Sequence, residues 1–249
     1  HIQSHAFGDT SQQSIGFDGG LTTRQSMRLV NTRFAALPAM FWDRRAINLK
    51  DQVTQPIQDH IEMGFSGTVD QPGLDSLLDK LNGLQYYTEL FDWAYEQEGV
   101  TINKQRLAQS LEHFVSSIES FDSRFDEGFD ATGDIQGQYS NFSPSENRGK
   151  SLFRAQPQLD NQNIRTAGGA GCAGCHRPPE FDINPISGNN GVDKEAGNPA
   201  GFDTTNTRSP SLRDIFGPDG QINTPMMHTG NFLEFTTIVE HYNEVIPDV

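Results

Sequence analysis

The chain of 249 residues contains only two cysteines, few basic residues and no long apolar segment. Its 18 lysines and arginines face 33 acidic residues, which gives a net charge of −15. Because contacts to phosphate need a basic surface, this balance argues against a nucleic-acid partner and favours a cationic protein partner. No run approaches the roughly 20 apolar residues of a membrane-spanning helix, so we expect no membrane span.

Strand-like alternation is almost absent, whereas apolar residues recur at helical spacing. Asn48 predicts the N-cap of a helix that Pro56 would kink. Further helices, each with its apolar face in the core, are predicted over residues 74–81, 86–94, 101–121, 144–153 and 235–245. Residues 126–143, rich in Asp, Gly and Ser, are predicted to connect two domains. The predicted fold class is mainly α, rich in loops and with little strand.

The two cysteines lie three positions apart and a histidine follows at once, in the segment Cys172-Ala173-Gly174-Cys175-His176. This is the attachment pattern of c-type haem, in which both thiols bond the porphyrin and the histidine ligates iron. Alternatives are a dithiol redox site, half of a zinc site, and a short disulfide. The first lacks a surrounding βαβ pattern, the second lacks further thiols, and the third leaves His176 unexplained.

The glycine-rich residues 167–171 suit a backbone that packs closely against a flat ring. Because thioether attachment of haem is normally completed outside the cytoplasm, we expect an exported, periplasmic protein.

Candidates for the sixth iron ligand lie in the segment Pro225-Met226-Met227-His228-Thr229-Gly230. A thioether ligand would raise the reduction potential and make the haem an electron-transfer centre. The alternative role of adjacent methionines is packing. From the chemistry alone, Met226, Met227 and His228 remain open.

Several motifs occur in an order and at a spacing that resemble one family. Residues 41–46, FWDRRA, resemble its FWDGRA signature with Arg44 in place of Gly. Residues 209–213, SPSLR, are similar to its TPSLR stretch, and residues 225–230, PMMHTG, to PYMHDG. Over nearly its whole length the chain resembles the bacterial di-haem cytochrome c peroxidases and their MauG-like relatives.

The resemblance implies two cytochrome c-like haem domains, residues 1–142 with a peroxidatic haem and residues 143–249 with an electron-transfer haem, both apparently truncated. Two haem c groups are then expected in the full-length protein. His1 would be the proximal ligand of the first, with its thiols just before the chain. His176 and Met227 would ligate the second.

The resemblance also assigns roles at the first haem. Glu62 would be the distal acid/base that moves a proton of bound peroxide. Gln52 would steady the peroxide by hydrogen bonding, Pro56 would shape the same wall, and Trp42 would conduct electrons between the haems.

Two features of the family's pattern bear on regulation and metal binding. The backbone carbonyls of Arg208 and Pro210 would belong to a calcium site, although Gln25 stands nearest to the expected asparagine. Phe17 stands where many relatives carry a loop histidine that blocks the first haem. This predicts a peroxide site that is open in every redox state.

The sequence thus predicts a peroxidase that reduces hydrogen peroxide with electrons from a small donor protein such as a cytochrome c or a cupredoxin. A homodimer is a further expectation. The first alternative is a MauG-like oxidase that modifies a tryptophan or another residue of a partner protein. The second is a single-haem electron-transfer cytochrome.

Overall fold

The computed structural model describes residues 1–249 except 69, 163, 184–188, 193–206 and 245–249. The described helices are α1 (Leu49–Gln52), α2 (Gln55–Gln58), α3 (Leu74–Asn82), α4 (Gln85–Ala94), α5 (Lys104–Ser116), α6 (Arg124–Thr132), α7 (Pro144–Arg154) and α8 (Phe235–Glu244). Short 3-10 turns are η1 (Gln3–His5), η2 (Thr32–Phe34) and η3 (Cys172–Gly174).

Two small antiparallel sheets complete the regular structure. Strand β1 (Pro157–Leu159) pairs with β2 (Arg165–Gly168), and β3 (His176–Arg177) pairs with β4 (Asp182–Ile183). The predicted fold class, mainly helical with little strand, is confirmed. Among the described residues, no helix is long and apolar enough to cross a membrane.

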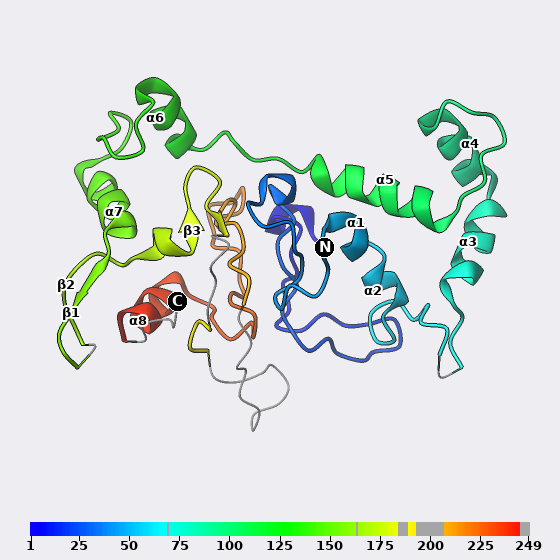
Figure 1. The fold of residues 1–249 in the computed structure, drawn as a ribbon, viewed down its shortest axis with the longest axis horizontal. Coiled ribbons are helices and arrows are strands. Elements are labelled where there is room, and N and C mark those ends of the chain that lie inside the picture. Colours follow the sequence, from blue (N-terminus) through cyan, green and yellow to red (C-terminus); the bar gives the residue numbers. More distant parts are fainter. Residues whose placement is uncertain (69, 163, 184–188, 193–206, 245–249) are drawn as a thin grey trace.

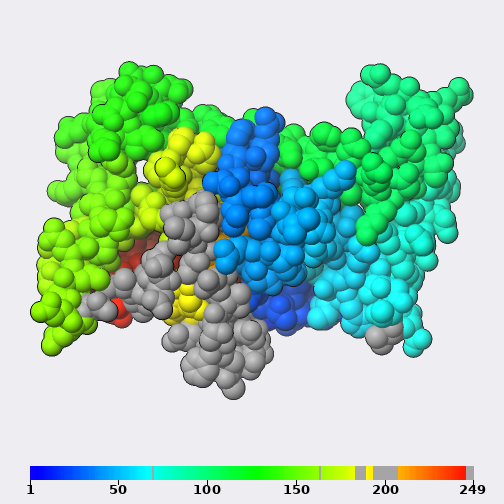
Figure 2. All heavy atoms as spheres, viewed as in Figure 1, coloured from blue at the N-terminus to red at the C-terminus, as the bar shows by residue number. Residues whose placement is uncertain are grey.

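The elements form two ends joined across the middle (Figure 1). Helices α3 and α4 lie at one end, and α6, α7 and the β1–β2 hairpin lie at the other, with α5 leading from one towards the other. In the space-filling view, the N-terminal residues abut the yellow segment that follows the cysteines (Figure 2). A backbone hydrogen bond of 2.9 Å from Gln25 N to His228 O also joins the two regions.

Helices α1 and α5 carry the core of the N-terminal region. The buried residues of this cluster are Met40, Ala46, Leu49, Val53, Ala108 and Val115. The predicted cap is confirmed, because the Asn48 side chain accepts the Asp51 N–H at 2.9 Å. The predicted kinked helix is instead two short helices. Pro56 lies in the first turn of α2, where its missing N–H leaves no intrahelical hydrogen bond unmade.

Helix α5 is shorter than its apolar pattern predicts. Asn103 caps it by accepting the Arg106 N–H at 3.0 Å, so the helix begins at Lys104 rather than at residue 101 as predicted. The helix ends at Ser116 rather than Phe121, and the Ser117 hydroxyl donates to the Phe114 carbonyl at 2.7 Å. A side-chain bond to a nearby carbonyl competes with helix continuation.

The predicted apolar face of α4 is only partly buried. Phe91 joins a second core cluster with Val100 and Ile102, as expected. Tyr86 and Leu90, however, are 54% and 55% exposed. Helical spacing establishes which residues share a stripe, but whether another element covers that stripe depends on packing.

Helix α6 occupies part of the segment predicted to be a connection. A reciprocal pair of hydrogen bonds between Ser123 and Asp126 starts the helix. Phe125 then packs against Phe181, with ring centroids 4.7 Å apart. The prediction of a connection rested on the Asp- and Gly-rich composition and took account of neither the Ser123–Asp126 cap nor the packing of Phe125. The domain division at residue 142 stays a prediction.

The connection between α5 and α6 is hydrogen-bonded to a loop of the N-terminal region and to a loop of the C-terminal region. The Asn31 side chain accepts the Ser120 N–H at 2.8 Å and donates to the Ser120 carbonyl at 3.0 Å. The Ser120 hydroxyl donates to Asp214 at 2.8 Å. One serine therefore anchors the connection to an N-terminal loop and to a C-terminal loop.

Candidate functional site

The cysteine segment presents two thiols and an imidazole on one turn of backbone. Cys172 begins η3, Cys175 follows it, and His176 begins β3 opposite Ile183. Both thiols are unbonded and partly buried, and burial raises the pKa of each. Burial also lowers the pKa of His176 to about 4, against an opposing effect of the Phe181 and Pro210 backbone. The imidazole is therefore neutral at pH 7, the form that binds iron.

This donor set fits a c-type haem. Thioether attachment needs two free thiols at this spacing, and the proximal ligand must be an unprotonated histidine. The buried Nδ1 atom of His176 makes no side-chain hydrogen bond of good geometry within the described residues. A neutral imidazole with the Phe181 and Pro210 backbone beside it is available as an iron ligand.

The glycine-rich segment before the cysteines packs against the C-terminal end of α7. A Cβ atom at Gly169 would lie 2.3 Å from the Ala155 carbonyl oxygen, at the end of that helix. The next two N–H groups donate to α7 carbonyls, from Ala170 to Leu152 at 2.7 Å and from Gly171 to Ala155 at 2.9 Å. The described contacts show that Gly169 is required for close packing against the end of α7, and the role of residues 167–171 beside a flat ring stays a prediction.

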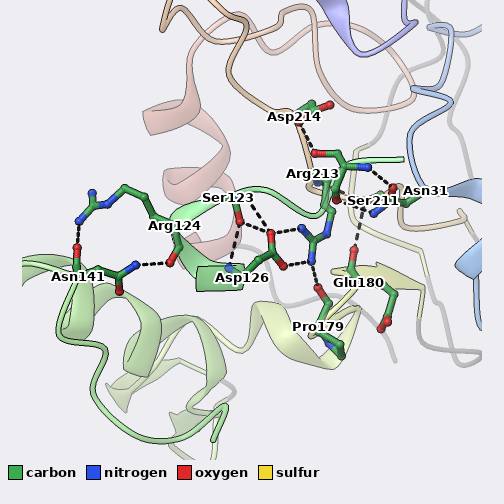
Figure 3. Close-up of polar contacts among 11 residues, drawn as sticks. Asn31, Ser123, Arg124, Asp126, Asn141, Pro179, Glu180, Ser211, Arg213 and Asp214 are labelled. Carbon is green, nitrogen blue, oxygen red and sulfur yellow. Dashed lines mark hydrogen bonds and ion pairs between the residues drawn. The ribbon is translucent and has the colours of Figure 1, made fainter. Parts of the chain in front are cut away.

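A buried ion pair fixes the hairpin that carries His176 (Figure 3). Arg213 donates two hydrogen bonds of 2.7 Å to Asp126 at the start of α6. It also donates to the Pro179 carbonyl at 2.6 Å, on the turn between β3 and β4. The side chains of Arg213 and Asp126 are 4% and 11% exposed. Arg213 lies in the SPSLR motif, but no pattern in the sequence indicates Asp126 as its partner.

The Met227 sulfur has two polar side chains as neighbours. The Tyr242 hydroxyl of α8 is 3.9 Å from the sulfur, and the Asn190 amide nitrogen is 3.8 Å from it. Burial raises the pKa of Tyr242, and the nearby thiols of Cys175 and Cys172 raise it further. Met227 has a φ of +65°, rare for a residue with a side chain, so its surroundings hold it in place.

The other two candidate ligands have different environments. Met226 is 7% exposed, and its N–H donates to the Phe232 carbonyl at 2.8 Å. His228 is 1% exposed and lies against Trp42, with ring centroids 5.9 Å apart. Of the three, Met227 has its sulfur beside the residues that surround the thiols.

Trp42 lies where the N-terminal and C-terminal parts of the chain meet. Its indole N–H donates to the Gln25 carbonyl at 2.7 Å, and its carbonyl accepts the Arg208 N–H at 2.7 Å. It also lines a cavity of about 40 Å³ together with His5, Pro210 and Met227. These contacts connect the Trp42 ring to the His228–Met227 segment.

The predicted distal residues lie on one continuous segment. Gln52 ends α1, Pro56 lies in α2, and Glu62 follows on the next loop. Asp59 shapes this loop, since its carboxylate accepts the N–H groups of Ile61 at 2.8 Å and of Glu62 at 2.9 Å. The sequence did not point to Asp59.

The electrostatics of Glu62 suit proton transfer. Burial raises the pKa of Glu62, the charge of Asp59 raises it further, and Arg45 opposes them. The Phe17 N–H donates to the Glu62 carbonyl at 3.1 Å. The Phe17 ring lies against Gly64, where a Cβ atom would be 2.4 Å away. Phe17 therefore packs directly on the Glu62 loop.

Two metal predictions remain, namely His1 as a haem ligand and calcium at the carbonyls of Arg208 and Pro210, and the side-chain geometry tests neither. His1 is exposed and its Nδ1 lies 2.5 Å from the Phe7 carbonyl, which leaves Nε2 for a ligand. Arg208 is buried and its guanidinium is 3.6 Å from Asp182. In the described part of the chain, no three His, Cys, Asp or Glu side chains form a metal-binding group. Calcium at the carbonyls of Arg208 and Pro210 stays a prediction.

Comparison with known proteins identifies the family of the chain. A mainly helical chain with a Cys-x-x-Cys-His turn and a buried methionine has the features of a c-type haem protein. The family model of the di-haem cytochrome c peroxidases matches residues 1–134. The chain therefore belongs to the di-haem cytochrome c peroxidase family, a family of oxidoreductases.

Individual relatives are distant and longer. The chain is 28% identical over 214 residues to methylamine utilization protein MauG of Methylophilus methylotrophus, which covers 84% of the chain and 55% of the relative. It is 26% identical to cytochrome c551 peroxidase of Nitrosomonas europaea, over 81% of the chain and 53% of the relative. The chain thus spans about half the length of these curated relatives.

A solved structure supports the fold. The chain resembles the crystal structure of a MauG-like protein associated with microbial copper homeostasis, with a TM-score of 0.66. The match covers 96% of this chain and 68% of the other at 22% identity. At that identity, the similarity establishes the fold alone.

Proposed function

We propose that the chain is the greater part of a periplasmic di-haem peroxidase that reduces hydrogen peroxide to water. Two electrons and two protons convert one peroxide to two waters, and a small redox protein would donate the electrons. The observation that carries the proposal is the position of Trp42 between the N-terminal region and the His228–Met227 segment.

Electrons would arrive at the haem held by Cys172, Cys175, His176 and Met227. A haem bound there supplies a one-electron iron centre, and a thioether ligand favours its reduced state. The chain's own contribution is the route onward. Trp42 is 8% exposed and lies against His228, next to the Met227 ligand, so it offers a buried aromatic path towards the haem assigned to His1.

Glu62 would act as the acid/base at the peroxide site. It would take the proton from the peroxide oxygen that faces the haem and deliver it to the oxygen that leaves as water. A carboxyl group with a raised pKa both accepts and releases a proton near neutral pH more readily than an ordinary one. Gln52 would hydrogen-bond the peroxide, and Pro56 would form the adjacent wall.

The donor would be a cationic protein, such as a cytochrome c or a cupredoxin. With a net charge of −15, the chain attracts a basic partner and speeds the encounter at low salt. The proposal retains the homodimer, and the calcium ion at the carbonyls of Arg208 and Pro210, as predictions.

The test replaces Glu62 by Gln in the full-length, haem-loaded protein. We expect kcat/KM for peroxide, with reduced cytochrome c as donor, to fall about 100-fold or more, the usual contribution of a positioned acid/base. Glu89→Gln on α4 is the matched control, since Glu89 is exposed and lies on another element. Equal activities of the two variants would refute the role of Glu62.

The similarity to MauG favours a second candidate, oxidation of a residue on a partner protein. The same protein preparation distinguishes them. Rapid peroxide consumption with reduced cytochrome c supports the peroxidase. Peroxide-dependent mass increase of a partner, with slow cytochrome oxidation, supports the oxidase.

A further inference from the structure

The Met227 sulfur is approached by two hydrogen-bond donors from different parts of the chain. One is the hydroxyl of Tyr242 on α8, at 3.9 Å, and the other is the side-chain amide of Asn190, at 3.8 Å. Both distances suit hydrogen bonds to sulfur, which is larger than oxygen and a weak acceptor. A methionine that serves only packing has no need of two polar neighbours.

We propose that Tyr242 and Asn190 are positioning residues that hydrogen-bond the Met227 sulfur and so raise the reduction potential of the haem assigned to His176 and Met227. The inference rests on the proposed ligation of that haem. It goes further in naming the residues that tune it, since hydrogen bonding to an axial ligand is one of the ways a protein sets such a potential.

The backbone of Tyr242 is held near the cysteine segment. Its carbonyl accepts a hydrogen bond of 3.0 Å from Arg165 on β2, and Arg165 also donates to the Gly169 carbonyl before the cysteines. This contact places the start of the Tyr242 side chain beside the attachment segment. A partly buried hydroxyl is stabilised by an acceptor, and the sulfur provides one.

Asn190 is held by the same helix. Its carbonyl lies 2.8 Å from the ring nitrogen of His241, the residue before Tyr242. Its side-chain amide also donates a hydrogen bond to the Tyr242 oxygen. Asn190 and Tyr242 thus each contact the Met227 sulfur and also contact each other.

The number of lone pairs on sulfur determines how the donors share it. A free thioether has two lone pairs and can accept from both donors. Once one lone pair binds iron, a single lone pair remains, so only one donor can bond the sulfur at a time while the other keeps its bond to its neighbour. The two donors can therefore substitute for each other.

The direction of the effect follows from charge. A hydrogen bond withdraws electron density from sulfur and weakens its donation to the more positive ferric iron more than to ferrous iron. The reduced state is therefore stabilised relative to the oxidised state, and the reduction potential of the haem rises. A neutral hydrogen bond of about 1 kcal/mol corresponds to about a fivefold change in the reduction equilibrium.

The test measures the midpoint potential of this haem by optical redox titration of the full-length, haem-loaded protein. The variants are Tyr242→Phe, Asn190→Leu and the double variant. Tyr95→Phe is the matched control, because the Tyr95 hydroxyl donates to the Arg106 carbonyl at 2.9 Å, on α5. The thioether-to-iron absorption band of the ferric protein reports whether Met227 remains bound.

We expect the band to persist in all variants. Each single variant should lower the potential slightly, and the double variant should shift the reduction equilibrium about fivefold, more than the two single shifts combined. A double variant with the potential of the Tyr95→Phe control and an intact band would overturn the inference alone. Absence of the band from the unsubstituted protein would overturn the Met227 ligation itself, and the inference with it.

Discussion

Replacing Asp126 by Asn should destabilise the protein far more than replacing Glu146 by Gln. The two carboxylates have the same local role, since each is the third residue of its helix and bonds back to a capping serine, Ser123 or Ser143. Each also pairs with an arginine. They differ in burial, which makes Glu146 the matched control for Asp126.

The expected magnitude follows from that burial. The Asp126 and Arg213 side chains are 11% and 4% exposed, whereas Glu146 and its partner Arg124 are 42% and 55% exposed. Removing one partner of a buried pair leaves an uncompensated charge and costs about 3–5 kcal/mol. For a chain of this size that lowers Tm by about 10 °C. The exposed pair is hydrated in both states, so its loss should change Tm little.

The loss of stability caused by Asp126→Asn should also depend on pH, in a direction that the pKa of Asp126 determines. Burial disfavours the charged form of Asp126, but hydrogen bonds from Arg213 and Ser123 outweigh it and hold the pKa below the ordinary 3.8. A depressed carboxyl pKa stabilises the fold above the unfolded value, and that stability disappears as the pH falls through the folded value. The difference between the parent and Asp126→Asn should therefore be constant near neutrality and shrink below about pH 4.

Urea unfolding of the haem-loaded variants, followed by far-UV circular dichroism at pH 7 and pH 3.5, measures both effects. The reasoning fails if Asp126→Asn and Glu146→Gln have the same midpoint. It also fails if the difference between parent and Asp126→Asn grows on acidification.

Two further predictions concern the proposed reaction. Asp59→Asn keeps an oxygen that can accept the N–H groups of Ile61 and Glu62 but removes a charge, so the pKa of Glu62 should fall. The acidic limb of the kcat/KM profile should then move to lower pH, and an unmoved limb would exclude an electrostatic role of Asp59. Trp42→Phe removes the indole N–H bond to Gln25 and widens the gap between the aromatic ring and His228, so electron transfer between the haems should slow in stopped-flow absorbance. An unchanged rate with unchanged haem spectra would rule out Trp42 as the conduit.

Local signals in the sequence predicted most helices. Asn48 marks the start of α1, Gly83 follows α3, and Ser143-Pro144 begins α7. Each is a short-range feature that acts within a turn of helix. The end of α5 was predicted too late because Ser117 bonds to the Phe114 carbonyl and Ser120 bonds to Asp214, and the apolar spacing does not indicate either contact.

Spacing alone reveals the site only where its residues are contiguous, whereas Met227, Trp42 and Glu62 were predicted from the resemblance to the family. The thiols and His176 occupy one turn, so spacing alone reveals them. Asp126 and Arg213 are 87 positions apart in the sequence, and Asn190 and Met227 are 37 apart. Contacts of that separation arise from tertiary packing and leave no periodic trace in a single sequence.

The double anchoring of Ser120 has a mechanical consequence. Hydrogen bonds from side chains of both flanking regions oppose bending of this linker, because opening the two halves about it would break the contacts of Asn31 and Asp214 with Ser120. The distance between the two proposed redox centres should therefore vary little while those contacts last.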